Sequence, residues 1–94
     1  MNSLLTGKCK EDFKDFLYNK YGVLCELNDY NETMLNAEII DFFDEKGIYV
    51  NAIRYNNHYF QAYCNYFMHE KYETRQEATT EAIKKANEIY NGSI

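Results

Sequence analysis

Two hydrophobic periods follow one another across residues 48–92, and this succession constrains the fold more than any other feature. Residues 48–55 and 58–67 are rich in aromatic and β-branched side chains and are separated by an Asn-Asn pair. After Thr74, apolar residues recur every three or four positions. The first pattern is typical of a β-hairpin and the second of an amphipathic helix. The sequence therefore predicts a folded α+β domain.

The final helix is predicted to begin with a capping box. Thr74 and Glu77 have the T-x-x-E spacing in which each side chain hydrogen-bonds to the backbone amide of the other residue. The apolar stripe that follows consists of Ala78, Ala82, Ile83, Ala86, Ile89 and Tyr90. Because most of these side chains are small, we expect the helix to lie close against a sheet.

Two amphipathic helices are predicted before the hairpin. The first covers residues 8–21 and stops at Gly22, which is suited to a left-handed C-terminal position. The second covers residues 33–46 and stops at Gly47. Their apolar stripes are Cys9, Phe13, Phe16, Leu17 and Tyr21 in the first helix, and Leu35, Ile39, Phe42 and Phe43 in the second. Residues 23–27 alternate in a way that fits either an edge strand or an extended loop.

A two-residue turn at Asn56-Asn57 would fix the register of the hairpin, since Asn tolerates the positive φ of tight turns. This turn pairs Tyr55 with His58, Ile53 with Phe60, Asn51 with Ala62, and Tyr49 with Cys64. Neither face of the hairpin is clearly polar, so we expect helices on one face and tyrosines on the other. The predicted order is α-α-β-β-α in one domain, residues 1–94, with residues 23–27 as an optional third, edge strand.

The net charge of −5 is unevenly distributed. Residues 1–45 carry ten acids and four lysines, whereas residues 46–94 carry five acids and six basic residues. An acidic half repels phosphate and attracts basic partners, although acids on a helix can also be merely solvated. On the second helix, the predicted acidic binding surface consists of Glu38, Asp41, Asp44 and Glu45. Ten tyrosines exceed what a small core can bury, so some should reach the surface.

No combination of residues predicts catalysis or metal binding. His58 and Cys64 are six residues apart on one strand, about 20 Å, and His69 lies beyond it. The aromatic neighbours of Cys64 would not activate its thiol, and there is no glycine-rich phosphate loop. We therefore expect a non-enzymatic protein with no metal, cofactor or small-molecule substrate. No apolar run suits a signal peptide or membrane span, which predicts a cytoplasmic protein with reduced cysteines.

Nucleic-acid binding is an alternative function that the charge disfavours. A sheet followed by a packed C-terminal helix partly resembles the double-stranded-RNA-binding domain, but that family has three strands and a lysine cluster at the start of its last helix. Here the helix begins with Thr-Arg-Gln-Glu. If the hairpin contacts nucleic acid, the predicted residues are Arg54, Tyr59 and Tyr63, exposed on one face. A further alternative is a homodimer that pairs hairpin to hairpin.

Three segments carry a resemblance to a group of small proteins. They read AEIIDFFDEKGIYV at residues 37–50, YETRQEA at residues 72–78 and AIKKANEIYN at residues 82–91. Over residues 34–91, about 60% of the chain, the sequence is similar to small uncharacterised proteins of phages and prophages of gut bacteria. The resemblance supplies no catalytic residues and implies a context, since small acidic phage proteins often bind a host protein. We therefore expect a binding protein in the bacterial host cytoplasm, with a host or phage protein as partner and inhibition of a host defence factor as its sharpest form.

Overall fold

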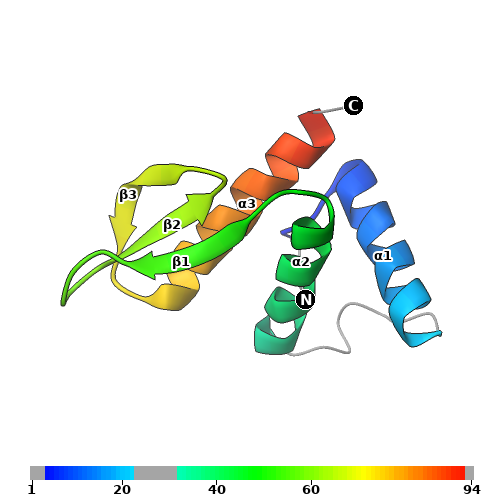
Figure 1. The fold of residues 1–94 in the computed structure, drawn as a ribbon, viewed down its shortest axis with the longest axis horizontal. Coiled ribbons are helices and arrows are strands. Elements are labelled where there is room, and N and C mark those ends of the chain that lie inside the picture. The colour runs from blue at the N-terminus through cyan, green and yellow to red at the C-terminus, as the bar shows by residue number, and fades with distance from the viewer. Residues whose placement is uncertain (1–3, 23–31, 93–94) are drawn as a thin grey trace.

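Three helices and a three-stranded antiparallel sheet make up the part of the chain that the computed structural model describes, residues 4–22 and 32–92 (Figure 1). The elements are α1 (Gly7–Tyr21), α2 (Glu32–Glu45), β1 (Val50–Arg54), β2 (Phe60–Cys64), β3 (Phe67–Tyr72) and α3 (Arg75–Gly92). The sheet has the order β1-β2-β3. The predicted α+β class is confirmed, with one strand more than the predicted hairpin.

The third strand, β3, lies where the sequence predicted the end of the hairpin and a loop. The chain turns after Cys64 through Asn65, which has a positive φ of 60°, and β3 then pairs antiparallel with β2. The register is irregular between Gln61 and Tyr63, where the Gln61 side-chain amide donates a hydrogen bond to the Met68 carbonyl at 2.7 Å. No residue of β3 is fully buried and only Met68 and Tyr72 are half-buried, so the strand lacks the apolar stripe that marks a strand in the sequence. The alternative edge strand at residues 23–27 lies outside the described residues.

The predicted two-residue turn of the hairpin is wrong, because the loop contains three residues, 56–58. The Tyr55 amide donates to the Tyr59 carbonyl at 2.9 Å. The Asn56 side-chain oxygen accepts from the backbone amides of His58 and Tyr59, at 2.8 and 2.9 Å. A side chain that closes its own turn in this way competes with the tighter primed turn. The observed pairs are Val50 with Cys64, Asn51 with Tyr63, Ala52 with Ala62, Ile53 with Gln61, and Arg54 with Phe60.

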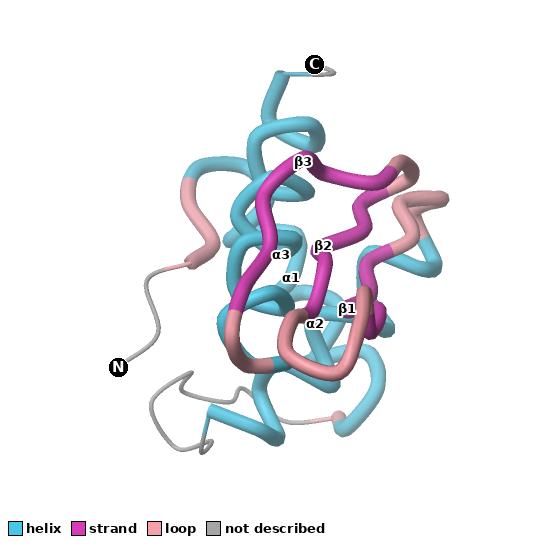
Figure 2. Tube along the Cα trace, turned by 90° about the vertical axis from the view of Figure 1, so that its left-hand side faces the viewer, coloured by secondary structure: helices cyan, strands magenta, loops and turns pink. Residues whose placement is uncertain are grey.

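One face of the sheet is covered by α3. Val50, Ala52, Ala62 and Cys64 are buried on this face, and α3 packs across β1 and β2. The helix meets the sheet through its small residues, as predicted, with Ala78, Ala82, Ile83 and Ala86 completely buried. In Figure 2 the strands lie in front of the helices, so no described helix covers the other face. The predicted capping box is also confirmed, since Glu77 N–H donates to Thr74 Oγ1 and Thr74 N–H donates to Glu77 Oε1.

An aromatic cluster joins the three helices at the other end of the molecule. The Phe42 ring on α2 lies 5.5 Å from that of Phe13, 5.6 Å from that of Phe16 and 5.6 Å from that of Tyr90, measured between centroids. The predicted stripes of α1 and α2 are therefore confirmed as core, except that Phe16 is half-buried and Tyr21 is exposed. The predicted helix stops at Gly22 and Gly47 are observed, and both glycines are left-handed, with φ of 76° and 82°.

The start of α1 is held by the end of α3 and not by a cap of its own. The Thr6 side chain makes no capping bond to α1, and the Cys9 amide donates instead to Asn91 Oδ1 at 2.9 Å. The Thr6 amide donates to Asn87 Oδ1 at 3.0 Å, while the Asn91 side-chain amide donates to the Thr6 carbonyl at 3.0 Å. A Cβ at Gly7 would meet the Asn91 side chain at 3.4 Å. We call Asn87 and Asn91 the asparagine clasp.

Removing one member of the asparagine clasp should lower stability. We expect Asn91→Ala to reduce the free energy of unfolding by about 1 kcal/mol, the usual effect of losing a helix N-cap. Ala has a higher helix propensity than Asn, so helix propensity alone predicts that Asn91→Ala raises the free energy of unfolding, whereas loss of the clasp predicts that it falls. Urea unfolding followed by circular dichroism measures the difference, with Glu88→Ala on the same helix as the control. A variant as stable as the wild type would contradict the clasp.

Candidate functional site

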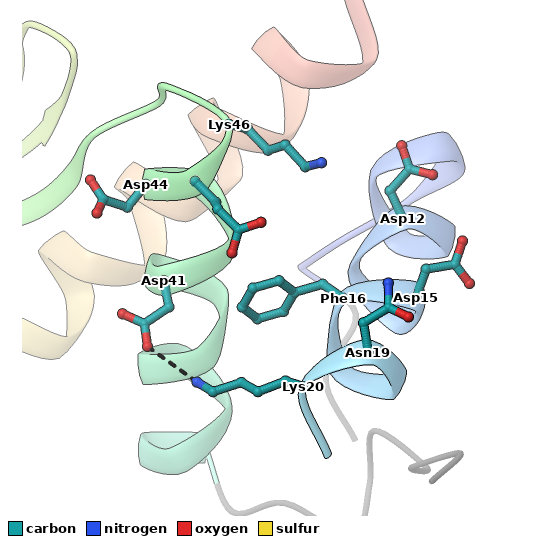
Figure 3. A pocket seen from close by; sticks show the side chains of 9 residues that line it. Asp12, Asp15, Phe16, Asn19, Lys20, Asp41, Asp44 and Lys46 are labelled. Carbon is teal, nitrogen blue, oxygen red and sulfur yellow. Dashed lines mark ion pairs between the residues drawn. The ribbon is translucent and has the colours of Figure 1, made fainter. Parts of the chain in front are cut away.

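An open groove of about 770 Å³ runs between α1 and α2 (Figure 3). The residues that line it are Asp12, Asp15, Phe16, Asn19 and Lys20 from α1, and Asp41, Asp44, Glu45 and Lys46 from α2. Five of these nine residues are carboxylates and two are lysines. In Figure 3 the Phe16 ring points from α1 toward α2, between the two helices. We call this surface the acidic groove.

Helical spacing places the carboxylates along the two walls of the acidic groove. Asp12 and Asp15 are three residues apart on α1, and Asp41 is followed by Asp44 and Glu45 on α2. Such spacings put side chains on one side of a helix, next to the stripe that enters the core. The contact between Phe16 and Phe42 brings the two acidic sides together.

Three of the four acids predicted for the binding surface lie in this groove, namely Asp41, Asp44 and Glu45. The fourth, Glu38, is engaged by α1 instead. It accepts a hydrogen bond from Lys20 Nζ at 2.8 Å and another from the Tyr21 hydroxyl. Asp12 and Asp15 were not predicted as site residues. Their helical spacing was visible in the sequence, but their place opposite α2 depends on tertiary packing.

One of the two lysines of the groove, Lys20, is paired with carboxylates of the fold. Lys20 Nζ lies 2.8 Å from Glu38 Oε1 and 3.5 Å from Asp41 Oδ2. Its hydrogen bond to Glu38 is the main cause of its raised pKa. Burial alone would raise the pKa of Glu38, but bonds from Lys20 and Tyr21 outweigh this and lower it. Lys46 Nζ lies 5.7 Å from the centroid of the Phe42 ring.

Three carboxylates of the acidic groove keep their charge available. Asp15, Asp44 and Glu45 make no ion pair with any residue in the described ranges. Unpaired carboxylates beside an aromatic ring can accept hydrogen bonds from Lys or Arg, whose aliphatic stems pack on apolar surface. The groove is therefore suited to basic side chains.

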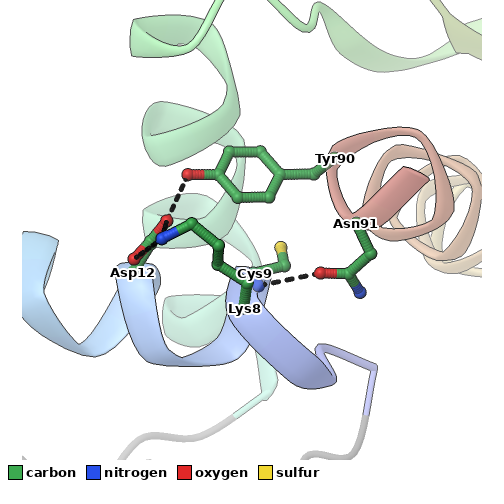
Figure 4. A network of polar contacts seen from close by, with 5 residues as sticks. All are labelled: Lys8, Cys9, Asp12, Tyr90 and Asn91. Atoms are coloured by element: carbon green, nitrogen blue, oxygen red, sulfur yellow. Dashed lines mark hydrogen bonds and ion pairs between the residues drawn. The ribbon is translucent and has the colours of Figure 1, made fainter. Parts of the chain in front are cut away.

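One end of the groove is joined to α3 through a phenol–carboxylate bond (Figure 4). The Tyr90 hydroxyl donates to Asp12 Oδ2 at 2.6 Å, and Lys8 Nζ lies 3.3 Å from the same oxygen. The hydrogen bond from Tyr90 is the main reason that the pKa of Asp12 is lowered. The same bond, together with burial, raises the pKa of Tyr90 to about 12.

The buried thiols near these elements are not set up for nucleophilic chemistry. Burial and the nearby Asp12 raise the pKa of Cys9 to about 12. Burial also raises the pKa of Cys64. Both residues are free and fully buried, so their thiols are protonated at neutral pH and pack as core side chains.

The described residues show neither a metal-binding cluster nor a membrane-spanning helix. Within residues 4–22 and 32–92, no group of three or more His, Cys, Asp or Glu side chains could hold a metal ion. No helix in these ranges is long and apolar enough to cross a bilayer.

The three residues predicted for the hairpin surface do not share one face. Arg54 is paired with Phe60, and its guanidinium carbon lies 4.8 Å from the centroid of that ring. Because side chains alternate along a strand, Tyr63 lies on the face opposite to Phe60. The cause is the one-residue difference in register. Tyr63 instead contacts the rings of Tyr49 and Phe67. Tyr59 precedes β2, and its ring contacts that of His58.

No protein-family model, no curated protein and no solved structure matches this chain. The resemblance to phage proteins therefore stays a prediction.

The bond between Tyr90 and Asp12 predicts how stability depends on pH. A carboxyl with a lowered folded pKa stabilises above its unfolded pKa, about 4, and this contribution is lost as pH falls. A phenol with a raised folded pKa stabilises below its unfolded pKa, about 10, and this contribution is lost as pH rises toward the folded value of about 12. The difference in stability between the wild type and Tyr90→Phe should therefore be largest and constant between about pH 4 and pH 10, and should shrink outside this range.

Melting temperatures of both proteins across this range measure this difference. The matched control is Tyr18→Phe, which removes an exposed hydroxyl from α1. It should leave the melting temperature unchanged at every pH. A Tyr90→Phe deficit that stays constant down to pH values well below 4 would show that the bond to ionised Asp12 is not its source.

Proposed function

We propose that this protein is a non-enzymatic binding protein of phage or mobile-element origin, and that its acidic groove holds a basic segment of a partner protein. The observation that carries this proposal is the groove itself, where five carboxylates and two lysines line an open channel between two helices. Lys20 is paired with Glu38 and Asp41, and the five carboxylates outnumber the two lysines, so the net charge offered to a partner is negative.

The shape of the groove favours a polypeptide over a small molecule. Helices α1 and α2 have 15 and 14 residues, which corresponds to walls about 20 Å long. Ligand pockets for small molecules are mostly apolar and enclose their ligand, whereas this groove is open and its walls are carboxylates. A helix or extended segment with several Lys or Arg residues would place its charges along the walls and its aliphatic stems on Phe16.

The sign of the charge indicates the class of partner. Proteins that bind nucleic acid present clustered Lys and Arg side chains to phosphates, and carboxylates along a groove offer such clusters a competing anionic surface. The partner that fits the groove is thus a nucleic-acid-binding protein of the bacterial host, such as a defence nuclease. The protein would inhibit this partner by occupying its nucleic-acid-binding surface. This assignment depends on the resemblance to phage proteins for its biological context and on the groove for its chemistry.

Isosteric neutralisation of the unpaired carboxylates tests the proposal. The variant D15N/D44N/E45Q keeps the shape of the groove and removes three charges. Each exposed ion pair contributes about 0.5 kcal/mol, so we expect affinity for a partner captured from host lysate to fall about tenfold. Capture of the partner by tagged wild-type protein, followed by titration with each variant, measures the change.

The matched control is E73Q/E81Q/E88Q, which removes three acids outside the groove and changes net charge equally. The control should bind the captured partner as the wild type does, and binding of the wild type should weaken as salt concentration rises. Equal loss in both variants would mean that net charge, not the groove, drives binding. A wild-type protein that captures no partner at moderate salt would count against a binding function.

A further inference from the structure

The uncovered face of the sheet carries a row of aromatic rings. Tyr49 and Phe67 are among the most exposed large side chains, at 59% and 55% of their full exposure. The Tyr63 ring lies between them, 6.4 Å from Tyr49 and 5.1 Å from Phe67 between centroids. Both contacts are edge-to-face, at interplanar angles of 88° and 75°. We call Tyr49, Tyr63 and Phe67 the aromatic row.

The charge of this face is opposite to that of the molecule as a whole. The observed register puts odd-numbered residues of β1 and β2 on the uncovered side, and Phe67 and Lys71 of β3 are paired with two of them. None of the odd-numbered residues from 49 to 71 is acidic, although the chain has fifteen acids. Lys71 Nζ lies 4.6 Å from the centroid of the exposed Tyr55 ring.

We propose that this face binds single-stranded nucleic acid, with bases stacking on the aromatic row and Lys71 contacting the phosphate backbone. Every base has a flat π-face, so stacking on aromatic side chains binds single strands without reading their sequence. The edge-to-face contacts hold the rings before a ligand arrives, which lowers the entropy lost on binding. Complementary charge comes from Lys71 on a face that lacks carboxylates.

The polar side chains between the rings favour bases over a second copy of the chain. Asn51 is paired with Tyr63, and Gln61 is paired with Lys71, so amide groups interrupt the apolar surface. Both amides also bond within the fold, since Gln61 Nε2 donates to the Met68 carbonyl and Asn51 Oδ1 accepts from the Ala52 amide. Two copies packed face to face would in addition take Lys71 out of water opposite a face whose odd-numbered residues include no acid, and burying an unpaired charge costs free energy. A phosphate of a nucleic acid pairs with this charge.

The acidic groove and the aromatic row are formed by different residues, although Tyr49 follows Lys46 of the groove by only three positions. The molecule is 42 Å long, and in Figure 1, where the longest axis is horizontal, the sheet lies at one end and α1 at the other. Exposed charges are screened over about 8 Å at physiological ionic strength. The α1 wall of the groove is thus remote from the sheet, and no residue belongs to both surfaces, so their tests use different variants and are independent.

Fluorescence anisotropy with labelled single-stranded RNA and DNA of about ten nucleotides tests the proposal. A duplex of the same length serves as competitor. We expect single strands to bind more tightly than the duplex, whose bases are already stacked. Few lysines or arginines of this face contact phosphates, so the association constant should depend only weakly on salt. Its logarithm should fall by about 0.7 per phosphate contact for each tenfold increase in salt concentration. Tyr49→Ala and Phe67→Ala should each weaken binding at least about fivefold.

Tyr18→Ala is the matched control, since it removes an exposed tyrosine from α1 and should leave binding unchanged. Circular dichroism of each variant shows that the fold is kept, which is expected because the substituted rings are largely exposed. The proposal is overturned if the wild type binds no single strand at low salt, or if both sheet variants bind as the wild type does. Sedimentation that reveals a dimer dissociated by Phe67→Ala would overturn it in favour of a second copy.

Discussion

The asparagine clasp between the end of α3 and the start of α1 determines where the acidic groove can form. Helix α1 contributes half of the groove, yet its first turn has no side-chain cap of its own. Asn91 satisfies one of the amides that a helix start leaves unpaired, and Tyr90 binds Asp12 one turn further on. Since α3 also packs on the sheet, this single helix positions both the groove and the aromatic row.

The clasp gives a physical reason for the motif that carries the resemblance to phage proteins. In AIKKANEIYN, residues 82–91, the alanines and Ile83 are buried, while Asn87, Tyr90 and Asn91 bind groups at residues 6–12. The motif therefore has a structural role. It also shows why residues 34–91 are not independent of the N-terminal helix, because without α1 two amides and one phenol would lose these partners.

Local signals predicted the parts of the fold that depend on local interactions. The capping box of Thr74 and Glu77 and the left-handed glycines 22 and 47 lie where the sequence placed them, since each is decided within one turn of chain. The register of the hairpin was not predictable in this way, because the Asn56 side chain selects a three-residue loop. Strand β3 was missed because it is an edge strand with no fully buried residue, so its sequence carries no apolar stripe. In the groove, helical spacing indicated Asp41, Asp44 and Glu45, but only packing shows that Glu38 faces Lys20 and that Asp15 lies across from α2.

The separation of charge along the molecule follows from how each element is buried. Helices α1 and α2 bury only a stripe, so their remaining positions must be polar, and in this chain they are mainly acidic. The sheet is buried on one face alone, and the alternation of strands leaves its other face free to differ in composition. On that face the chain carries exposed rings and no acid, although charged side chains at these positions would have favoured solubility. Large exposed aromatic side chains reduce solubility unless a partner covers them, so the physical cost of this face is the strongest reason to look for its ligand.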